Sequence, residues 1–112
     1  MNLGLQGKVA IVTGASRGIG NAIAHGLADE GCKLTICARG EEALASAAAA
    51  LREKGAEVVE VCLDITDADA GEMLTQKTLD AYGSIDVFVG NAGGNRRGQF
   101  ADTSDQDWQD II

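Results

Sequence analysis

The sequence contains no proline and only one histidine, His25. The lack of proline is consistent with an unbroken series of short strand–helix units, since proline interrupts both kinds of element. His25 falls within a predicted helix, and we expect it to have a structural or surface role rather than a catalytic one. No stretch of the sequence is long and apolar enough to span a membrane as a helix.

The chain has no excess of positive charge, and a secretory leader is not expected. Its formal net charge is −8, whereas binding to a nucleic-acid backbone requires a positive surface. An acidic chain must hold an anionic ligand through local features, because its overall field repels the ligand. The first residues lead almost directly into a predicted strand, so we expect a cytoplasmic protein. Nucleic-acid and membrane partners are therefore not expected.

The three cysteines, Cys32, Cys37 and Cys62, show no C-x-x-C spacing. Cys37 and Cys62 fall inside predicted strands, where a free cysteine behaves as a small buried hydrophobic residue. If the two strands are neighbours, a redox pair is conceivable. Buried thiols of a cytoplasmic protein are the simpler interpretation.

Strand and helix patterns alternate along the chain. Strands are predicted over 9–13, 34–38, 58–63 and 85–89, and helices over 18–30, 41–54 and 66–82. A capping-box pattern at 104–107 begins a further helix. The inward helix faces are predicted to comprise Ile19, Ile23 and Leu27, then Leu44, Ala48 and Leu51, and finally Ala70, Leu74 and Ala81.

Right-handed crossovers between these strands predict the strand order 3-2-1-4. The predicted fold class is α/β, a Rossmann-like doubly wound parallel sheet that is partial and incomplete at its C-terminus. We expect residues 1–112 to form the N-terminal part of one such domain.

A glycine-rich turn with the spacing Gly14-x-x-x-Gly18-x-Gly20 links the first strand to the first helix. Gly14 lets the strand turn sharply, Gly18 lets the backbone approach phosphate oxygens, and Gly20 lets the helix pack closely on the strand. The amides and the dipole at the start of the helix favour an anion. Because the turn lies between a buried strand and an amphipathic helix, it indicates a dinucleotide site. A purely structural turn is the alternative.

The segment 13–20, Thr-Gly-Ala-Ser-Arg-Gly-Ile-Gly, resembles the T-G-x-x-x-G-x-G signature of the short-chain dehydrogenase/reductase family. Asn91-Ala92-Gly93 resembles the N-A-G motif that follows the fourth strand in this family, and the segment 5–9 and Asp64 match as well. The resemblance covers essentially the whole chain, which corresponds to about the first half of such a protein. It implies a nicotinamide dinucleotide cofactor and an oxidoreductase activity.

Charge at the end of the second predicted strand bears on the choice of cofactor. In these folds a carboxylate about 20 residues beyond the glycines binds the ribose diol of NAD. Here Ala38 and Arg39 take that place, and an arginine pairs with a 2′-phosphate that a carboxylate would repel. Arg17 is a plausible second contact, so NADP is expected in preference to NAD. Alternatively, Arg39 is a solvated residue whose charge is met by Glu41 and Glu42.

Two further groups are assigned by the resemblance. Asp64 takes the place of an acidic side chain near the adenine amino group, with the Ile65 backbone beside it, although Asp64 fits equally well as a cap of the turn before the next helix. Asn91, Ala92 and Gly93 are expected to line the cofactor's ribose. The predicted cofactor-binding residues are thus Gly14, Ser16, Arg17, Gly18, Ile19, Gly20, Arg39, Asp64, Ile65, Asn91, Ala92 and Gly93. Arg96 and Arg97 face either substrate or solvent.

No catalytic residue and no metal ligand is assigned. The serine and the Tyr-x-x-x-Lys pair known in the family lie beyond the fourth strand, and the family's asparagine lies in the helix that begins near Ser104. Tyr82 is followed four residues later by Asp86 rather than lysine, so it is not the catalytic tyrosine. We therefore expect the N-terminal part of a longer reductase.

The expected function is that of an NADP(H)-dependent oxidoreductase acting on a carbonyl or a secondary alcohol, represented by its cofactor-binding half. One alternative is a catalytically inactive nucleotide-binding module, and another is an interaction fragment completed by a second chain. The family usually forms homo-oligomers. The fourth strand is expected at the sheet edge, where it favours self-association.

Overall fold

The computed structural model of the chain describes residues 4–90. Four parallel strands form one sheet in the order β3-β2-β1-β4. The strands are β1 (Val9–Thr13), β2 (Lys33–Ala38), β3 (Val58–Cys62) and β4 (Val87–Val89), and the helices are α1 (Gly18–Asp29), α2 (Glu41–Glu53) and α3 (Ala70–Tyr82). The doubly wound α/β fold and its predicted strand order are confirmed.

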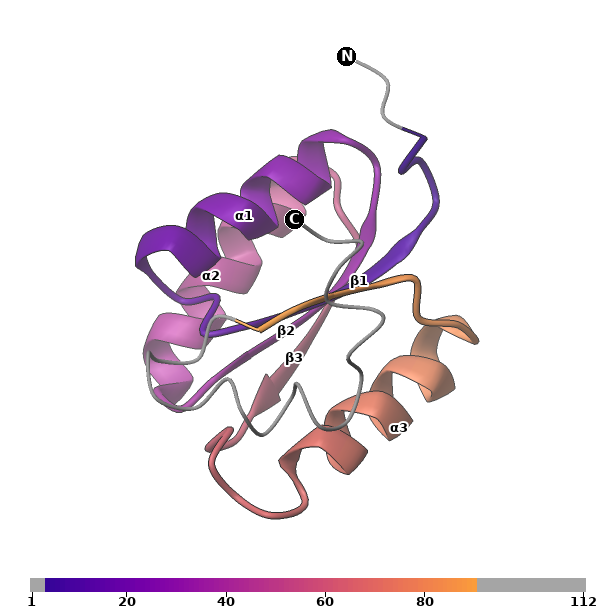
Figure 1. The fold of residues 1–112 in the computed structure, drawn as a ribbon. Coiled ribbons are helices and arrows are strands. Elements are labelled where there is room, and N and C mark those ends of the chain that lie inside the picture. Colours follow the sequence, from indigo (N-terminus) through magenta and orange to yellow (C-terminus); the bar gives the residue numbers. More distant parts are fainter. Residues whose placement is uncertain (1–3, 91–112) are drawn as a thin grey trace.

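The helices cover both faces of the sheet. Helices α1 and α2 lie together on one face, and α3 lies on the other (Figure 1). All five residues of β1 are buried, as the central strand of a parallel sheet between two helical layers must be. Ala10 and Val12 pack toward α1 and α2, while Ile11 packs toward α3. Alternate residues of β1 therefore serve two separate cores.

The face of helix α1 that packs on the sheet agrees with the prediction only in part. Gly20 and Ala24 are its buried residues, Ile23 and Leu27 are partly buried against the core, and Ile19 is 69% exposed. The prediction that Ile19 faces the sheet is therefore wrong. Small residues bring the backbone of the helix close to the sheet, and Ile19 lies in the first turn, on another side of the helix. For α2, the predicted inward residues Leu44, Ala48 and Leu51 are confirmed as buried.

Helix α3 begins later than the sequence pattern predicts. The residues before Ala70 form turns, and the hydrogen bonds from Asp67 N to Asp64 O (2.9 Å) and from Ala70 N to Asp67 O (3.1 Å) hold them. Its buried residues are Ala70, Leu74 and Thr78, whereas Ala81 is exposed. The inward face follows a spacing of four, which the polar Thr78 obscures in the sequence.

Strand β4 lies at one edge of the sheet and is shorter than predicted. Its pairing with β1 begins at Ala10↔Val87. Just before it, Asp86 bonds to Val9 twice: Asp86 N donates to Val9 O, and Val9 N donates to Asp86 Oδ2, both at 2.8 Å. At this point the Asp86 carboxylate, rather than a backbone carbonyl of the neighbouring strand, accepts the hydrogen bond from the Val9 amide.

The cysteines are all free thiols. Cys32 and Cys37 are buried, but Cys62 is exposed, which corrects the prediction that it is a buried strand residue. Strands β2 and β3 are neighbours, yet the register pairs Cys37 with Val61 and Ala38 with Cys62. Adjacent register positions point to opposite faces of a sheet, so the two thiols lie on opposite faces and the redox-pair hypothesis has no geometric support.

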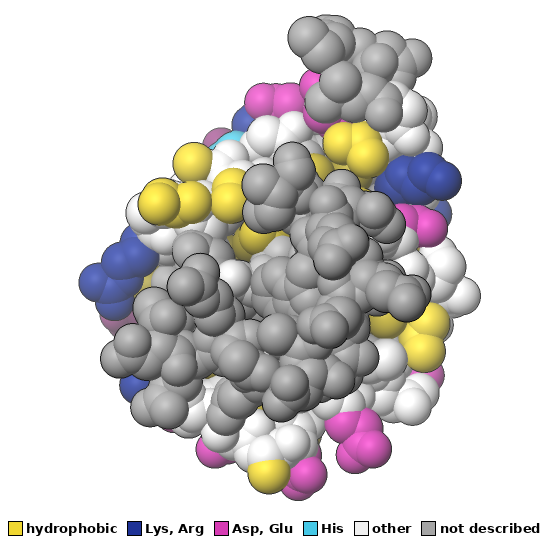
Figure 2. All heavy atoms as spheres, in the orientation of Figure 1, with side chains coloured by type: hydrophobic (Ala, Val, Ile, Leu, Met, Phe, Trp, Pro, Cys, Tyr) yellow, Lys and Arg dark blue, Asp and Glu magenta, His cyan; other side chains and the backbone are white. Residues whose placement is uncertain are grey.

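Figure 2 shows acidic and basic side chains around the rim of the face that it presents, with hydrophobic side chains in small separate patches. Within residues 4–90, the large hydrophobic side chains that are exposed are Ile19, Met73 and Leu79. No described helix is long and apolar enough to cross a membrane.

Candidate dinucleotide-binding site

The glycine turn leaves β1 with two glycines in the left-handed region, Gly14 and Gly18, each at a φ of 62°. L side chains rarely adopt this conformation, so glycine is needed at both positions. A Cβ built on Gly18 meets no described atom within 4 Å. Among residues 4–90, nothing therefore fills the space beside the backbone at the position where the sequence predicted a close approach to phosphate.

Two hydrogen bonds hold the turn in place. Ala15 N donates to Cys37 O (3.2 Å), which ties the turn to the end of β2. Asn21 Nδ2 donates to Ala15 O (3.1 Å), which ties it to α1. The backbone around Gly14 and Gly18 is thereby fixed before any ligand binds.

Helix α1 begins at this turn without a side-chain cap. Arg17 is its N-cap residue, in extended conformation, and makes no capping hydrogen bond. The first amides of a helix have no partner within the helix, and with the helix dipole they make a binding site for an anion. Arg17, Gly18 and Ile19 are exposed, Ser16 is half-buried, and Gly20 is buried against the sheet.

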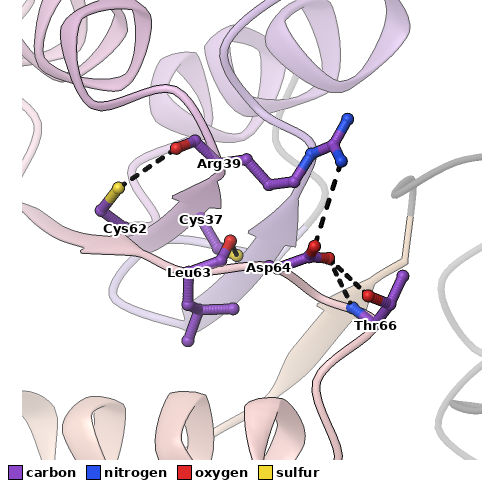
Figure 3. A network of polar contacts seen from close by, with 6 residues as sticks. All are labelled: Cys37, Arg39, Cys62, Leu63, Asp64 and Thr66. Atoms are coloured by element: carbon purple, nitrogen blue, oxygen red, sulfur yellow. Dashed lines mark hydrogen bonds and ion pairs between the residues drawn. The ribbon is translucent and has the colours of Figure 1, made fainter.

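The ends of the neighbouring strands β2 and β3 bring Arg39 and Asp64 together (Figure 3). Arg39 Nη1 lies 4.0 Å from Asp64 Oδ2, with 78% of the arginine side chain and 38% of the aspartate side chain exposed. The contact is a loose ion pair. Arg39 thus pairs with Asp64. The alternative interpretation had its charge met by Glu41 and Glu42 instead.

Asp64 is held firmly by the turn that follows it. Its Oδ1 accepts hydrogen bonds from Thr66 N (2.9 Å) and from Thr66 Oγ1 (2.7 Å). The structure therefore supports the turn-capping interpretation of this residue. Ile65 is 7% exposed, and its side chain belongs to the core under α3, so its backbone is what it can offer to a ligand.

The thiols of Cys62 and Cys37 complete the arrangement at the strand ends. Cys62 Sγ donates to Arg39 O (3.3 Å), and Cys37 Sγ donates to Leu63 O (3.9 Å). Burial, with smaller effects of the neighbouring Cys62 and Asp64, raises the pKa of Cys37 to about 12. Cys37 is therefore an unreactive structural thiol.

Two residues that support these groups, Thr66 and Asn21, were not singled out from the sequence, and the contact that Cys62 makes with Arg39 was not predicted. The Asp64-Ile65-Thr66 segment carries the signature of an Asx-turn, which makes Thr66 recoverable in principle. The bond from Asn21 to a carbonyl six residues earlier, and the bond from Cys62 to the neighbouring strand, depend on the tertiary fold. No local sequence pattern predicts these two hydrogen bonds.

The predicted residues Asn91, Ala92 and Gly93 lie outside the described part of the chain, as do Arg96 and Arg97. Among residues 4–90, no group of three or more His, Cys, Asp or Glu residues is placed to hold a metal ion.

A parallel sheet in the order 3-2-1-4, with an uncapped helix after a glycine turn at its central strand, defines the class of doubly wound nucleotide-binding domains. Residues 8–112 match the family model described as short chain dehydrogenase. The chain belongs to the short-chain dehydrogenase/reductase family, as the resemblance implied. Proteins of this family bind a nicotinamide dinucleotide.

Among curated relatives, the chain is 42% identical to a 3-oxoacyl-acyl-carrier-protein reductase (FabG) of Chlamydia muridarum, covering 100% of this chain and 46% of the relative. It is 37% identical to the corresponding reductase of Haemophilus influenzae, covering 96% of this chain and 43% of the relative. The chain thus spans less than half the length of these relatives.

Solved structures give the same picture with two different cofactors. The L-sorbose reductase of Gluconobacter frateurii, solved with NADPH and L-sorbose, is 36% identical, with a TM-score of 0.80 over 89% of this chain and 42% of that one. A short chain dehydrogenase/reductase of Burkholderia phymatum, solved with NAD, is 37% identical, with a TM-score of 0.73 over 75% of this chain and 30% of that one. The choice between the two cofactors therefore rests on the residues of this chain.

Proposed function

We propose that this chain is the cofactor-binding part of an NADP(H)-dependent oxidoreductase that acts on a carbonyl or a secondary alcohol. The observation that carries the proposal is the glycine turn, whose Gly18 has open space beside its backbone, with Arg39 exposed at the end of the neighbouring strand. When bound, a nicotinamide dinucleotide supplies hydride exchange with the substrate.

The pyrophosphate fits the turn between β1 and α1. Gly14 and Gly18 give the backbone its left-handed conformation, and Gly20 lets α1 lie close to the sheet. The amides from Gly18 onward are the donors for the phosphate oxygens, with Ser16 and the backbone of Ile19 beside them. The positive end of the helix dipole of α1 thereby offsets, at this place, the repulsion between the acidic chain and an anionic cofactor.

The 2′-phosphate is assigned to Arg39, with Arg17 as a second contact. Ala38 brings no carboxylate to the end of β2, so nothing at that position repels a phosphate. The side chain of Arg39 is exposed and its guanidinium can pair with two phosphate oxygens. These features favour NADP over NAD.

The adenine is assigned to the end of β3, where Asp64 and the backbone of Ile65 lie. Asn91, Ala92 and Gly93 remain predicted contacts of the ribose. No proton donor is assigned within residues 4–90: Tyr82, for example, donates its hydroxyl to Leu34 O (2.9 Å) and serves the fold. A homo-oligomeric state and a cytoplasmic location also remain predictions.

The choice of a carbonyl substrate rests on relatives. The curated relatives named above are 3-oxoacyl-acyl-carrier-protein reductases, and the solved neighbour is an L-sorbose reductase. Each of these substrates carries a carbonyl group, which suggests the class of substrate without choosing a member.

The test compares the affinities of the purified chain for NADPH and NADH by titration calorimetry. Arg39→Ala is expected to weaken NADPH binding about tenfold, the effect of one charge-assisted hydrogen bond, and to leave NADH binding nearly unchanged. Gly18→Ala is expected to weaken both cofactors by more than tenfold, because its Cβ enters the phosphate position. The matched control is Gly26→Ala, an exposed glycine of α1 with open space beside it, which is expected to bind like the parent chain.

Absence of binding to either cofactor contradicts the proposal and favours an interaction fragment completed by another chain. Binding without turnover on a panel of ketones is the result expected of this chain, because no catalytic residue is assigned to it. An equal loss of NADPH and NADH binding in Arg39→Ala contradicts the assignment of the 2′-phosphate.

A further inference from the structure

We propose that Asp64 determines the selectivity of this chain for NADPH over NADH, because its carboxylate competes with the 2′-phosphate for Arg39. The inference rests on the proposed function and deepens it. It assigns to Asp64 a role that differs from an adenine contact, since an adenine contact acts on both cofactors alike.

The backbone of Arg39 is fixed, and only its side chain can adapt. The Cys62 thiol donates to Arg39 O (3.3 Å), and Ala38 just before it is buried in the sheet in register with Cys62. The side chain of Arg39 is nevertheless 78% exposed. Figure 3 shows it beside the end of β3, where its guanidinium makes the ion pair with Asp64. A bound phosphate must draw this guanidinium from its present partner.

The carboxylate is fixed as well, and its orientation leaves one oxygen toward Arg39. Both hydrogen bonds from Thr66 go to Oδ1, whereas the contact with Arg39 is made by Oδ2. Figure 3 shows the two sets of contacts on opposite sides of the same carboxyl group. The negative charge is therefore held at the end of β3 whether or not Arg39 faces it.

Two consequences follow for a ligand with a 2′-phosphate. The phosphate must displace the ion pair between Arg39 and Asp64 or share the guanidinium with the carboxylate. NADH, which lacks the phosphate, leaves the pair undisturbed. The pair is exposed and loose, so its loss is expected to change selectivity by about threefold to fivefold.

The test measures dissociation constants for NADPH and NADH on the full chain, and on Asp64→Asn. The asparagine carbonyl oxygen can still accept both bonds from Thr66, so the turn is kept while the charge is removed. The NADPH-over-NADH selectivity is expected to rise about threefold to fivefold, and the rise is expected to shrink in high salt. Asp64→Ser, which retains a short turn-forming acceptor, is the second variant and is expected to shift selectivity in the same direction.

Two controls separate competition from other effects of charge. Asp69→Asn removes the same charge from an exposed residue at the start of α3 that makes no side-chain cap, and it is expected to leave selectivity unchanged. In an Arg39→Gln background, Asp64→Asn is expected to lose its effect on selectivity, because no guanidinium remains to compete for. If the rise persists in that background, the carboxylate repels the phosphate directly and the competition model is overturned.

The remaining outcomes are also decisive. If Asp64→Asn weakens NADPH and NADH by the same factor, Asp64 acts on the adenine and the inference is wrong, while the proposed function stands. If the parent chain binds neither cofactor, the proposed function fails and the inference fails with it. Adenosine 2′,5′-bisphosphate and 5′-AMP, used as probes of the adenosine end alone, are expected to show the same change in selectivity as the two cofactors.

Discussion

Gly18 and Gly26 differ in the conformation that each one needs. Gly18 has a φ of 62°, whereas Gly26 lies inside α1 with ordinary helical backbone, and neither has a described atom within 4 Å of a built Cβ. Gly18→Ala is expected to lower the free energy of unfolding by about 1–2 kcal/mol, the strain of a left-handed alanine.

Gly26→Ala is expected to raise the free energy of unfolding by about 0.5–1 kcal/mol, because alanine favours the helix. Urea unfolding followed by circular dichroism measures both variants. Equal effects at the two positions would show that the turn does not hold Gly18 in its left-handed conformation.

The three thiols are expected to react at very different rates. Cys62 is exposed, whereas Cys32 and Cys37 are buried, and burial raises the pKa of both buried thiols, to about 12 for Cys37. Since the thiolate is the reactive form, a maleimide at pH 7.5 should label Cys62 alone in the native chain. Mass spectrometry after brief labelling measures this, and Cys62→Ser should abolish it. Rapid labelling at Cys37 would contradict the burial of the sheet's end.

Single positions show where sequence reasoning succeeds and where it stops. The conformations of Gly14 and Gly18 were predictable, because only glycine tolerates them and the motif sets their spacing. The exposure of Cys62 and of Ile19 was predicted wrongly. Which face of an element is buried depends on what packs against it, and local composition does not carry that information.

Helix α3 is joined to the sheet by a buried hydrogen bond. The Thr78 and Thr35 hydroxyl oxygens lie 2.9 Å apart, Thr78 Oγ1 also donates to Leu74 O (2.7 Å), and both threonines are 0% exposed. Thr78→Val is expected to cost about 1–3 kcal/mol of unfolding free energy, because it leaves the Thr35 hydroxyl buried without this partner.

The double variant Thr35→Val/Thr78→Val tests that explanation. Replacing both hydroxyls by methyl groups of similar shape removes the unsatisfied group, so much of the lost stability should return. Chemical unfolding of the two single variants and the double variant gives the coupling energy. Additive losses would mean that the two hydroxyls do not depend on each other.

The ends of helices and strands were less predictable than their order. Strand β1 was recognised from its uniformly apolar residues, and helix α2 was recognised from the helical spacing of Leu44, Ala48 and Leu51. The start of α3 and the start of β4 were not, because Asp64 and Asp86 use side-chain oxygens to replace backbone partners. Hydrogen bonds to these two side chains do not alter the hydrophobic pattern of the sequence, so that pattern does not show where the helix or the strand begins.

For the molecule as a whole, buried acids with raised pKa values make alkaline pH destabilising. Burial raises the pKa of Cys37 from 9.0 to about 12 and also raises the pKa of Cys32 and Tyr82. Above pH 9 the unfolded chain loses the Cys37 proton while the folded chain retains it. Stability due to Cys37 is therefore complete below pH 9 and falls by up to about 1.4 kcal/mol per pH unit until about pH 12.

Urea unfolding at several pH values between 8 and 11, under reducing conditions, measures this dependence. Cys37→Ala is expected to be less stable at pH 8 because of the cavity, but to show a flatter decline with rising pH. Parallel declines in the parent and the variant would contradict the assigned pKa of Cys37.

The overall topology followed from the sequence because right-handed crossovers leave few arrangements for four parallel strands. The candidate site followed only in part. The turn at Gly14–Gly18 was local and predictable, whereas the contact between Arg39 and Asp64 joins two strand ends and depends on the register of β2 and β3. From the sequence, Arg39 was expected to contact the 2′-phosphate and Asp64 the adenine. In the fold the two side chains form an ion pair with each other.

The affinity of the purified chain for NADPH and for NADH, measured by calorimetry at one ionic strength, tests the proposed site most directly. We expect NADPH to bind about tenfold more tightly, because Arg39 supplies a charge-assisted contact that only the 2′-phosphate can use. Equal affinities would contradict the role of Arg39. Tighter binding of NADH would contradict the assignment of the 2′-phosphate to Arg39, and no binding of either cofactor would contradict the proposed site as a whole.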